Sequence, residues 1–122
     1  TSNPEARAIQ SVPVGEESTI AQGVVDECAA FNVEAQKANK PGDVGVVVGA
    51  TLDNPPRLDA LNGPVLLPGV GAQGAGPEQV HGIVSARPSL GFANVSRAVL
   101  EQGPDVADLR KAVAQVAAEF RD

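Results

Sequence analysis

Three short apolar runs alternate with helix-like segments, and this order constrains the fold more than any other feature. The runs are residues 44–51, 64–68 and 91–96. The runs are mainly apolar, which is typical of strands buried on both faces of a parallel sheet. Because parallel strands need crossover connections, the order helix, strand, helix, strand, helix, strand, helix predicts an α/β fold with right-handed crossovers.

Helices are expected on both sides of each strand. Residues 18–38 carry apolar side chains at steps of three and four, with Ser18 or Thr19 as the N-cap. A brief helix is expected within 52–63, another opens on Pro77, and a C-terminal helix follows Asp105 as its cap. The apolar face of the first helix consists of Ile20, Val24, Cys28, Phe31 and Ala35, and that of the last consists of Val106, Leu109, Val113, Val116 and Phe120.

The number of strands limits the architecture. Each strand–helix unit has the length found in both barrels and doubly wound sheets, but three strands are too few to close a barrel. Three parallel strands with exposed edges would also be a poor free-standing domain. The sequence begins at Thr1 and contains no Met. We therefore expect a piece of a larger α/β domain.

Composition excludes several classes of function. The net charge is −6 and the nine Lys and Arg residues are scattered, which argues against a nucleic-acid surface. No apolar run approaches the roughly 18 residues of a membrane helix, so no membrane contact is expected. A single cysteine, Cys28, excludes an intrachain disulfide and a multi-cysteine metal site. The default expectation is a cytoplasmic protein, and binding of a small anion stays compatible with its charge.

The segment after the second strand is rich in glycine. It reads PGVGAQGAG over residues 68–76. Glycines remove side chains where a backbone turns sharply or approaches a ligand, and amides at the start of the next helix can bind an anion. From the glycine spacing alone, a tight turn without a ligand is an equally good interpretation.

An arginine follows the third strand. Arg97 could bind a phosphate through two parallel hydrogen bonds, although alone it is better explained as a surface arginine in an ion pair. The two features strengthen each other, because barrel enzymes often bind phosphate in the loops after their last two strands. Here those two loops carry the glycines and Arg97.

These segments resemble a known family. VVVGAT, LLPGVGAQGAG and NVSRAVL resemble the sixth, seventh and eighth strand–loop segments of orotidine 5′-phosphate decarboxylase, in the longer subgroup found in actinobacteria, and TSNPEA resembles the end of its fifth strand. The resemblance covers the whole chain. It implies that residues 1–122 are the C-terminal part of a single (β/α)8 TIM-barrel domain, strands 5/6 to 8 with their helices, whose N-terminal half is not in this chain.

The family's activity is the cofactor-free decarboxylation of orotidine monophosphate to uridine monophosphate in pyrimidine synthesis, in most members by a homodimer. The resemblance implies that Gln73 and Arg97 contact the substrate phosphate, with Gly74 and the amide following Ser96 as backbone donors. It also implies that Ser2 bonds the pyrimidine edge and Gln73. By the same resemblance, Pro68 corresponds to the proline that lines the family's ring pocket. The chain departs from the family at Ala75, where a second glycine is usual.

The family's Asp-x-Lys-x-x-Asp run does not occur in the chain. We therefore expect no catalytic residue, no metal and no cofactor here, and no activity of the chain by itself. Two alternatives stay open: a non-catalytic phosphosugar or nucleotide binder, and one piece of a split barrel that works beside a complementary chain. His81 and Cys28 are better explained as an ordinary helical histidine and a small buried side chain.

Overall fold

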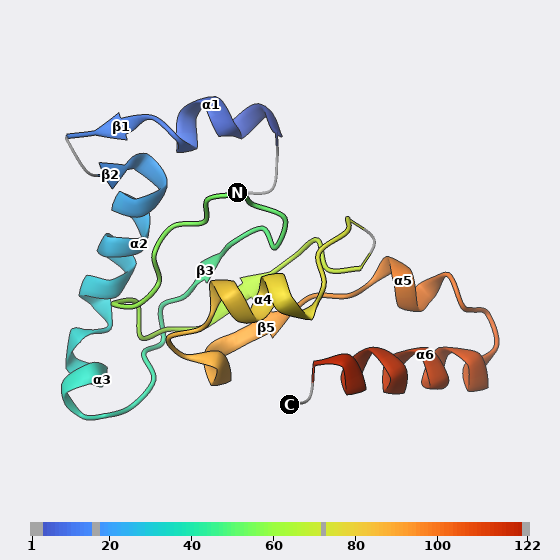
Figure 1. The fold of residues 1–122 in the computed structure, drawn as a ribbon. Coiled ribbons are helices and arrows are strands. Elements are labelled where there is room, and N and C mark those ends of the chain that lie inside the picture. The colour runs from blue at the N-terminus through green and yellow to red at the C-terminus, as the bar shows by residue number, and fades with distance from the viewer. Residues whose placement is uncertain (1–3, 16–17, 72, 121–122) are drawn as a thin grey trace.

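The computed structural model describes residues 4–15, 18–71 and 73–120. Its first elements are a 3-10 turn, η1 (Pro4–Ala6), a short helix, α1 (Arg7–Gln10), and an antiparallel pair of strands, β1 (Pro13–Val14) and β2 (Ser18–Thr19). The sequence patterns predicted none of these four elements. They lie together at one end of the molecule, beside the start of α2 (Figure 1).

The central sheet has three parallel strands, as predicted. They are β3 (Val46–Val47), β4 (Val65–Leu67) and β5 (Gly91–Ala93), and their order in the sheet follows their order in the chain. Parallel strands with helices before β3, between β4 and β5 and after β5 confirm the α/β class.

The named strands are shorter than the predicted ones, but their hydrogen bonding continues beyond them. The Val48 N–H donates to the Leu66 carbonyl and the Ala50 N–H donates to the Pro68 carbonyl, both at 2.9 Å. The backbone of β3 and β4 thus stays paired to the point where the loops begin.

A buried asparagine divides the first predicted helix in two. The structure has α2 (Ile20–Phe31) and α3 (Val33–Lys37) in place of one helix over 18–38. Asn32 lies between them with 2% of its surface exposed. Its amide donates to the Val44 and Leu61 carbonyls at 2.7 and 2.8 Å and accepts from the Val44 N–H at 3.1 Å. These bonds tie the end of α2 to the segments that precede β3 and β4.

The predicted apolar face of α2 is wrong in part. Thr19 caps the helix as expected, since its hydroxyl accepts from the Gln22 N–H at 3.2 Å. However, Val24 is 56% exposed and Phe31 is 76% exposed, whereas Gln22 and Val25 are buried. The helix turns its polar Gln22 inward because the side-chain amide finds backbone partners there, which removes the usual cost of burying it.

No helix forms between residues 52 and 63, all of which the structure describes. This prediction is wrong. Pro55 and Pro56 have no N–H to donate, and the Arg57 N–H donates to the Gln22 side chain of α2 at 2.8 Å. The segment closes with a single turn bond, from the Leu61 N–H to the Leu58 carbonyl.

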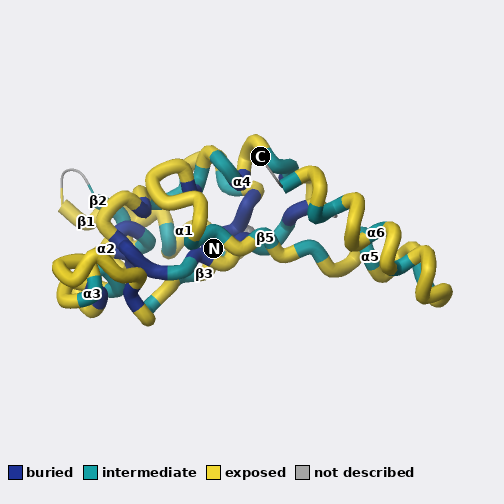
Figure 2. Tube along the Cα trace, turned by 90° about the horizontal axis from the view of Figure 1, so that it is seen from below, coloured by how far each residue is buried: buried dark blue, intermediate teal, exposed yellow. Residues whose placement is uncertain are grey.

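Three helices follow the glycine-rich segment: α4 (Pro77–Ile83), α5 (Arg97–Leu100) and α6 (Val106–Glu119). The start of α4 at Pro77 is confirmed, and so is the Asp105 cap, whose carboxylate accepts from the Ala107 N–H at 2.7 Å. The short α5 was not predicted. α5 leads away from the sheet and α6 runs back toward it (Figure 1, Figure 2). On the predicted apolar face of α6, Phe120 packs against the core, whereas Val106 and Val113 are exposed.

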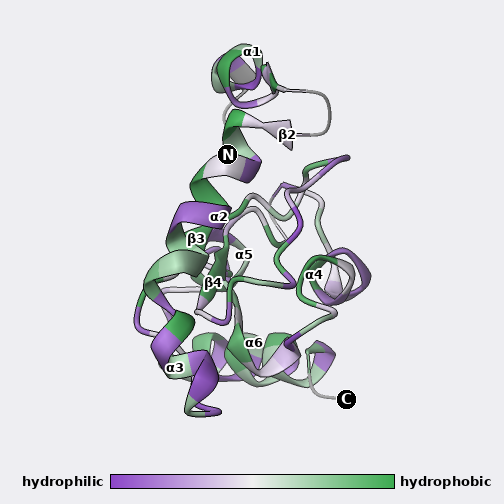
Figure 3. Cartoon of the chain, turned by 90° about the vertical axis from the view of Figure 1, so that its left-hand side faces the viewer, coloured by the Kyte–Doolittle hydropathy of each residue, from purple (hydrophilic) through white to green (hydrophobic). Residues whose placement is uncertain are grey.

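The hydrophobic core lies on one face of the sheet. α2 lies beside β3, and the α4 segment packs over β4 and β5 (Figure 1, Figure 3). The core is made mainly of Val and Leu side chains, namely Val25, Val48, Leu58, Leu61, Val65, Leu67, Val70, Val80 and Val84, with Ala50 and Ala75.

The opposite face of the sheet is bare. Val47, Leu66 and Phe92 are direct neighbours across the three strands, and they are 53%, 40% and 54% exposed. We call this set the bare row. The prediction of strands buried on both faces is therefore wrong for this chain, because the core side chains cover only one face. No helix in the described residues is both long and apolar enough to cross a membrane.

Candidate functional site

The strands β3, β4 and β5 end at the same edge of the sheet. We call the segments that follow them there, residues 49–57, 68–76 and 94–97, the carboxyl edge. In parallel α/β folds, ligands bind at this edge because successive loops converge on it.

The glycine-rich segment has a backbone that only glycine adopts easily. Gly69, Gly71 and Gly74 have φ angles of +96°, +72° and +92°, in the region that side chains disfavour. The segment closes on itself: the Gly71 N–H donates to the Ala75 carbonyl, and the Gly74 N–H donates to the Gly71 carbonyl, both at 2.9 Å. The predicted use of the Gly74 N–H by phosphate would require that bond to be shared or released.

The side chain of Gln73 folds back over the start of this segment. A Cβ atom on Gly69 would lie 2.8 Å from Gln73 Oε1, closer than van der Waals contact allows. Gly69 therefore provides both the backbone angle and the space that the glutamine amide occupies. Gln73 itself is exposed, so its amide is accessible at the carboxyl edge.

The structure brings the glycine segment and the Arg97 segment together. A Cβ atom on Gly71 would lie 3.4 Å from Ala98 Cβ and 3.8 Å from Val95 Cγ1. These two side chains flank Arg97 closely in sequence. The loops after β4 and β5 are thus in contact, as Figure 1 also indicates.

Arg97 is the first residue of α5 and is exposed. The predicted strand over 91–96 ends earlier, at Ala93, so Arg97 lies four residues beyond the strand. Its own N–H belongs to the first helical turn, where amides lack a helical acceptor. A guanidinium and a backbone amide at this position can both serve an anionic oxygen.

Ser96 makes a contact that the sequence analysis missed. Its hydroxyl donates to Asn94 Oδ1 at 3.0 Å, and both residues are exposed. Asn94 was placed within a strand and was given no role. The signal that could have found it is a polar residue in an otherwise apolar run, two residues before a serine.

The structure describes one of the two residues predicted to contact the pyrimidine ring. Ser2 lies outside the described residues. Pro68 is half-buried at the end of β4, and its carbonyl accepts from the Ala50 N–H at 2.9 Å. Its ring-pocket role stays a prediction.

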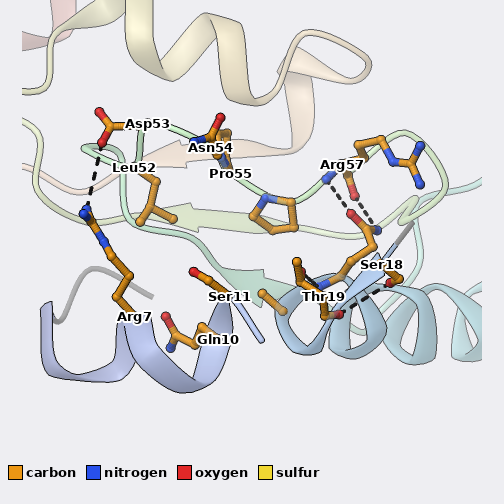
Figure 4. Close-up of a pocket in the computed structure, with 13 residues that line it drawn as sticks. Arg7, Gln10, Ser11, Ser18, Thr19, Leu52, Asp53, Asn54, Pro55 and Arg57 are labelled. Carbon is orange, nitrogen blue, oxygen red and sulfur yellow. Dashed lines mark hydrogen bonds and ion pairs between the residues drawn. The ribbon is translucent and has the colours of Figure 1, made fainter. Parts of the chain in front are cut away.

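A cavity of about 400 Å³ lies between α1, the start of α2 and residues 52–57 (Figure 4). Arg7 and Asp53 approach to 4.0 Å at this cavity, but both are well exposed, so the pair contributes at most about 1 kcal/mol. Gln22 and Arg57 also line the cavity. Gln22 Nε2 donates to the Arg57 carbonyl at 3.2 Å, and Gln22 Oε1 accepts from the Arg57 N–H at 2.8 Å. None of the predicted substrate-binding residues that the structure describes lines this cavity.

In residues 4–15, 18–71 and 73–120, no group of three or more His, Cys, Asp or Glu side chains is arranged to hold a metal ion. Cys28 is half-buried against the core, as expected for a small apolar side chain.

The chain is similar to known decarboxylases. It is 51% identical over 120 residues to orotidine 5′-phosphate decarboxylase of Corynebacterium efficiens and 47% identical to that of Corynebacterium glutamicum. A crystal structure assigned to orotidine 5′-phosphate decarboxylase from Streptomyces avermitilis matches with a TM-score of 0.81 at 40% identity. The chain belongs to the orotidine 5′-phosphate decarboxylase family.

The matches extend over 98% of the chain but only 43% of each Corynebacterium decarboxylase and 41% of the Streptomyces structure. The chain therefore spans less than half the length of these relatives. No protein-family model matches it, so the family assignment rests on these alignments. With the decarboxylase structure as its neighbour, the three-stranded parallel sheet is part of a (β/α)8 barrel, and the predicted fold class is confirmed.

Proposed function

We propose that the whole protein to which this sequence belongs converts orotidine 5′-monophosphate to uridine 5′-monophosphate, and that this chain supplies the phosphate-binding loops and part of the pyrimidine pocket. The observation that carries the proposal is the close approach of Gly71 to Val95 and Ala98, whose side chains an added Cβ would reach at 3.8 and 3.4 Å. It brings the glycine segment against the segment of Arg97, in a chain that is about half identical to named orotidine 5′-phosphate decarboxylases.

In this proposal four groups bind the phosphate. Arg97 binds it bidentately through its guanidinium, and its backbone amide, which follows Ser96, donates a further hydrogen bond. The Gln73 amide covers the phosphate from the glycine segment, and the Gly74 N–H shares its donation between the phosphate and the Gly71 carbonyl. Pro68 and Ser2 contact the pyrimidine ring.

The reaction breaks the bond between the pyrimidine ring and its carboxylate, releases CO2 and places a proton on the ring carbon. No residue of this chain is assigned to that proton transfer, because the chain lacks the family's Asp-x-Lys-x-x-Asp run. The phosphate lies away from the bond that breaks, yet its binding can raise the rate. Binding energy gained there can close loops, exclude water and favour the transition state.

The bare row supports a larger barrel. Val47, Leu66 and Phe92 are each 40% exposed or more, although parallel sheets are covered on both faces in complete domains. In a (β/α)8 barrel this face points inward and is filled by layers of side chains from all strands. We propose that residues 1–122 form the C-terminal part of one barrel domain and that residues present in the longer relatives complete it. A cytoplasmic homodimer is proposed on the family resemblance.

The test is turnover by two proteins. The full-length protein is expected to decarboxylate orotidine monophosphate, followed by the change in pyrimidine absorbance, and residues 1–122 alone are expected to give no rate above background. A full-length protein that binds uridine monophosphate without turnover would favour the non-catalytic nucleotide binder instead. Turnover by residues 1–122 alone would refute the assignment of the catalytic groups to the rest of the protein.

A further inference from the structure

Asn94 extends the sheet by one residue beyond β5. Its N–H donates to the Leu67 carbonyl at 3.0 Å, and Leu67 is the register partner of Ala93. One step further along both strands, Asn94 lies beside Pro68. Asn94 is therefore a neighbour, across the sheet, of the residue proposed to line the pyrimidine pocket.

Alternation along the strand indicates the direction of the Asn94 side chain. Successive side chains of a strand point to opposite faces, so residues two apart share a face. Asn94 follows Phe92 by two residues, and Phe92 belongs to the bare row. Asn94 thus lies on the face that the proposed barrel turns inward, at its open carboxyl edge, and it is itself exposed.

A hydrogen bond fixes the orientation of the Asn94 amide. The Ser96 hydroxyl donates to Asn94 Oδ1 at 3.0 Å. With Oδ1 held by Ser96, the Nδ2 group is directed to the other side of the amide. No described residue accepts a hydrogen bond from Nδ2, so two N–H donors are available at the carboxyl edge.

We propose that Asn94 is a specificity-determining residue that donates a hydrogen bond from Nδ2 to a ribose hydroxyl of the bound nucleotide. This inference rests on the proposed function. Pro68 contacts the ring and Arg97 contacts the phosphate in that proposal, and Asn94 lies beside the first and three residues before the second. The ribose joins ring to phosphate, so it passes the Asn94 amide. Ser96 is a positioning residue, since its hydroxyl orients that amide.

The experiment measures the dissociation constants of the full-length protein for uridine monophosphate, its 2′-deoxy and 3′-deoxy forms, and uridine. We expect Asn94→Ala to raise the dissociation constant for uridine monophosphate about tenfold, the effect of one lost hydrogen bond. We expect the wild-type protein to bind one of the two deoxynucleotides about tenfold less tightly than uridine monophosphate. Asn94→Ala should abolish that difference, which a purely structural role would leave in place.

Two serine variants test the orienting contact. Ser96→Ala keeps the backbone amide and removes only the hydroxyl. It should raise the dissociation constant for uridine monophosphate roughly threefold, because the Asn94 amide is then no longer oriented. Ser89→Ala is the control, because Ser89 is an exposed serine that precedes β5 and thus lies at its amino end. It should leave binding unchanged, and an equal effect of both variants would overturn the positioning role of Ser96.

Other outcomes separate the inference from the function on which it rests. If the wild-type protein decarboxylates orotidine monophosphate but binds both deoxynucleotides as tightly as uridine monophosphate, the ribose contact is wrong and the function stands. If Asn94→Ala weakens the binding of uridine monophosphate but not the binding of uridine, Asn94 contacts the phosphate and the ribose assignment is wrong. A wild-type protein without turnover or nucleotide binding would overturn both proposals.

Discussion

The amide side chains at the two ends of the sheet differ in how they are used. Asn32, which precedes β3 and β4, is 2% exposed. Its side-chain amide forms hydrogen bonds with backbone groups of Val44 and Leu61. At the carboxyl edge, Gln73 and Asn94 are exposed. The same chemical group thus holds the fold at one end and is accessible to a ligand at the other.

Burial and backbone partners, rather than residue type, distinguish the structural amide of Asn32 from the exposed amides of the carboxyl edge. A buried amide that loses its partners leaves polar backbone groups unsatisfied, which is costly. An exposed amide exchanges protein partners for water with little change in stability. Substitutions of these amides and of the loop glycines in the full-length protein should therefore differ widely in their effect on its stability.

Asn32→Ala should have the largest effect. It leaves the Val44 and Leu61 backbone groups without partners inside the protein, so we expect a loss of about 3 kcal/mol in the free energy of unfolding. Urea unfolding measures it. The matched variant Asn32→Asp keeps the size but cannot donate to either carbonyl, and it should be at least as destabilising. The KM of the folded fraction should stay unchanged, and a selective rise in KM would contradict a purely structural role.

Gln22→Ala tests whether burial makes an amide structural even at the carboxyl edge. Gln22 is buried, and its partner Arg57 belongs to that edge. The change removes both hydrogen bonds to the Arg57 backbone, and we expect a loss of about 2 kcal/mol in stability. Thermal unfolding and steady-state kinetics, measured together, are the check. A stable variant would mean that exposure to the cavity beside α1 lets water replace those bonds.

Gly71→Ala tests the packing between the loops that follow β4 and β5. Gly71 and Gly74 both have positive φ angles, so alanine at either position should cost about 1 kcal/mol in strain. Only at Gly71 does the added Cβ reach Ala98 and Val95, at van der Waals distances of 3.4 and 3.8 Å, whereas nothing lies within 4 Å of it at Gly74. The added contact should offset part of the strain, so Gly71→Ala should lose less stability than Gly74→Ala, as measured by urea unfolding. Equal losses in the two variants would argue against the packing of the two loops.

Gln73→Ala should have the smallest effect on stability, within about 0.5 kcal/mol, because the side chain is exposed. We expect KM for orotidine monophosphate to rise about tenfold through the lost contact with the phosphate. Steady-state kinetics measure KM, and a thermal melt supplies the control for folding. A destabilised variant with unchanged KM would place Gln73 among the structural amides.

Local sequence signals predicted much of the fold. The apolar runs predicted three parallel strands, and Thr19, Pro77 and Asp105 marked the starts of three helices because caps act within a few residues. The glycine spacing and Arg97 predicted two loops at one edge, and the structure places these loops in contact.

What the sequence could not predict depends on contacts between distant residues. The inward face of α2 is set by Gln22 and Asn32, whose partners Arg57 and Leu61 lie 35 and 29 residues away. No helical periodicity contains that information. The same distant contact holds Arg57 in the segment over 52–63, where a helix was expected.

We propose above that the carboxyl edge binds the substrate phosphate through Arg97. The most direct test compares Arg97→Ala with the wild-type full-length protein on two substrates, orotidine monophosphate and orotidine, which lacks the phosphate. We predict that kcat/KM for the monophosphate falls about a hundredfold, the effect of about 3 kcal/mol from a lost charge-assisted pair, while kcat/KM for orotidine stays unchanged. An equal fall for both substrates, or no fall for the monophosphate, would contradict the account.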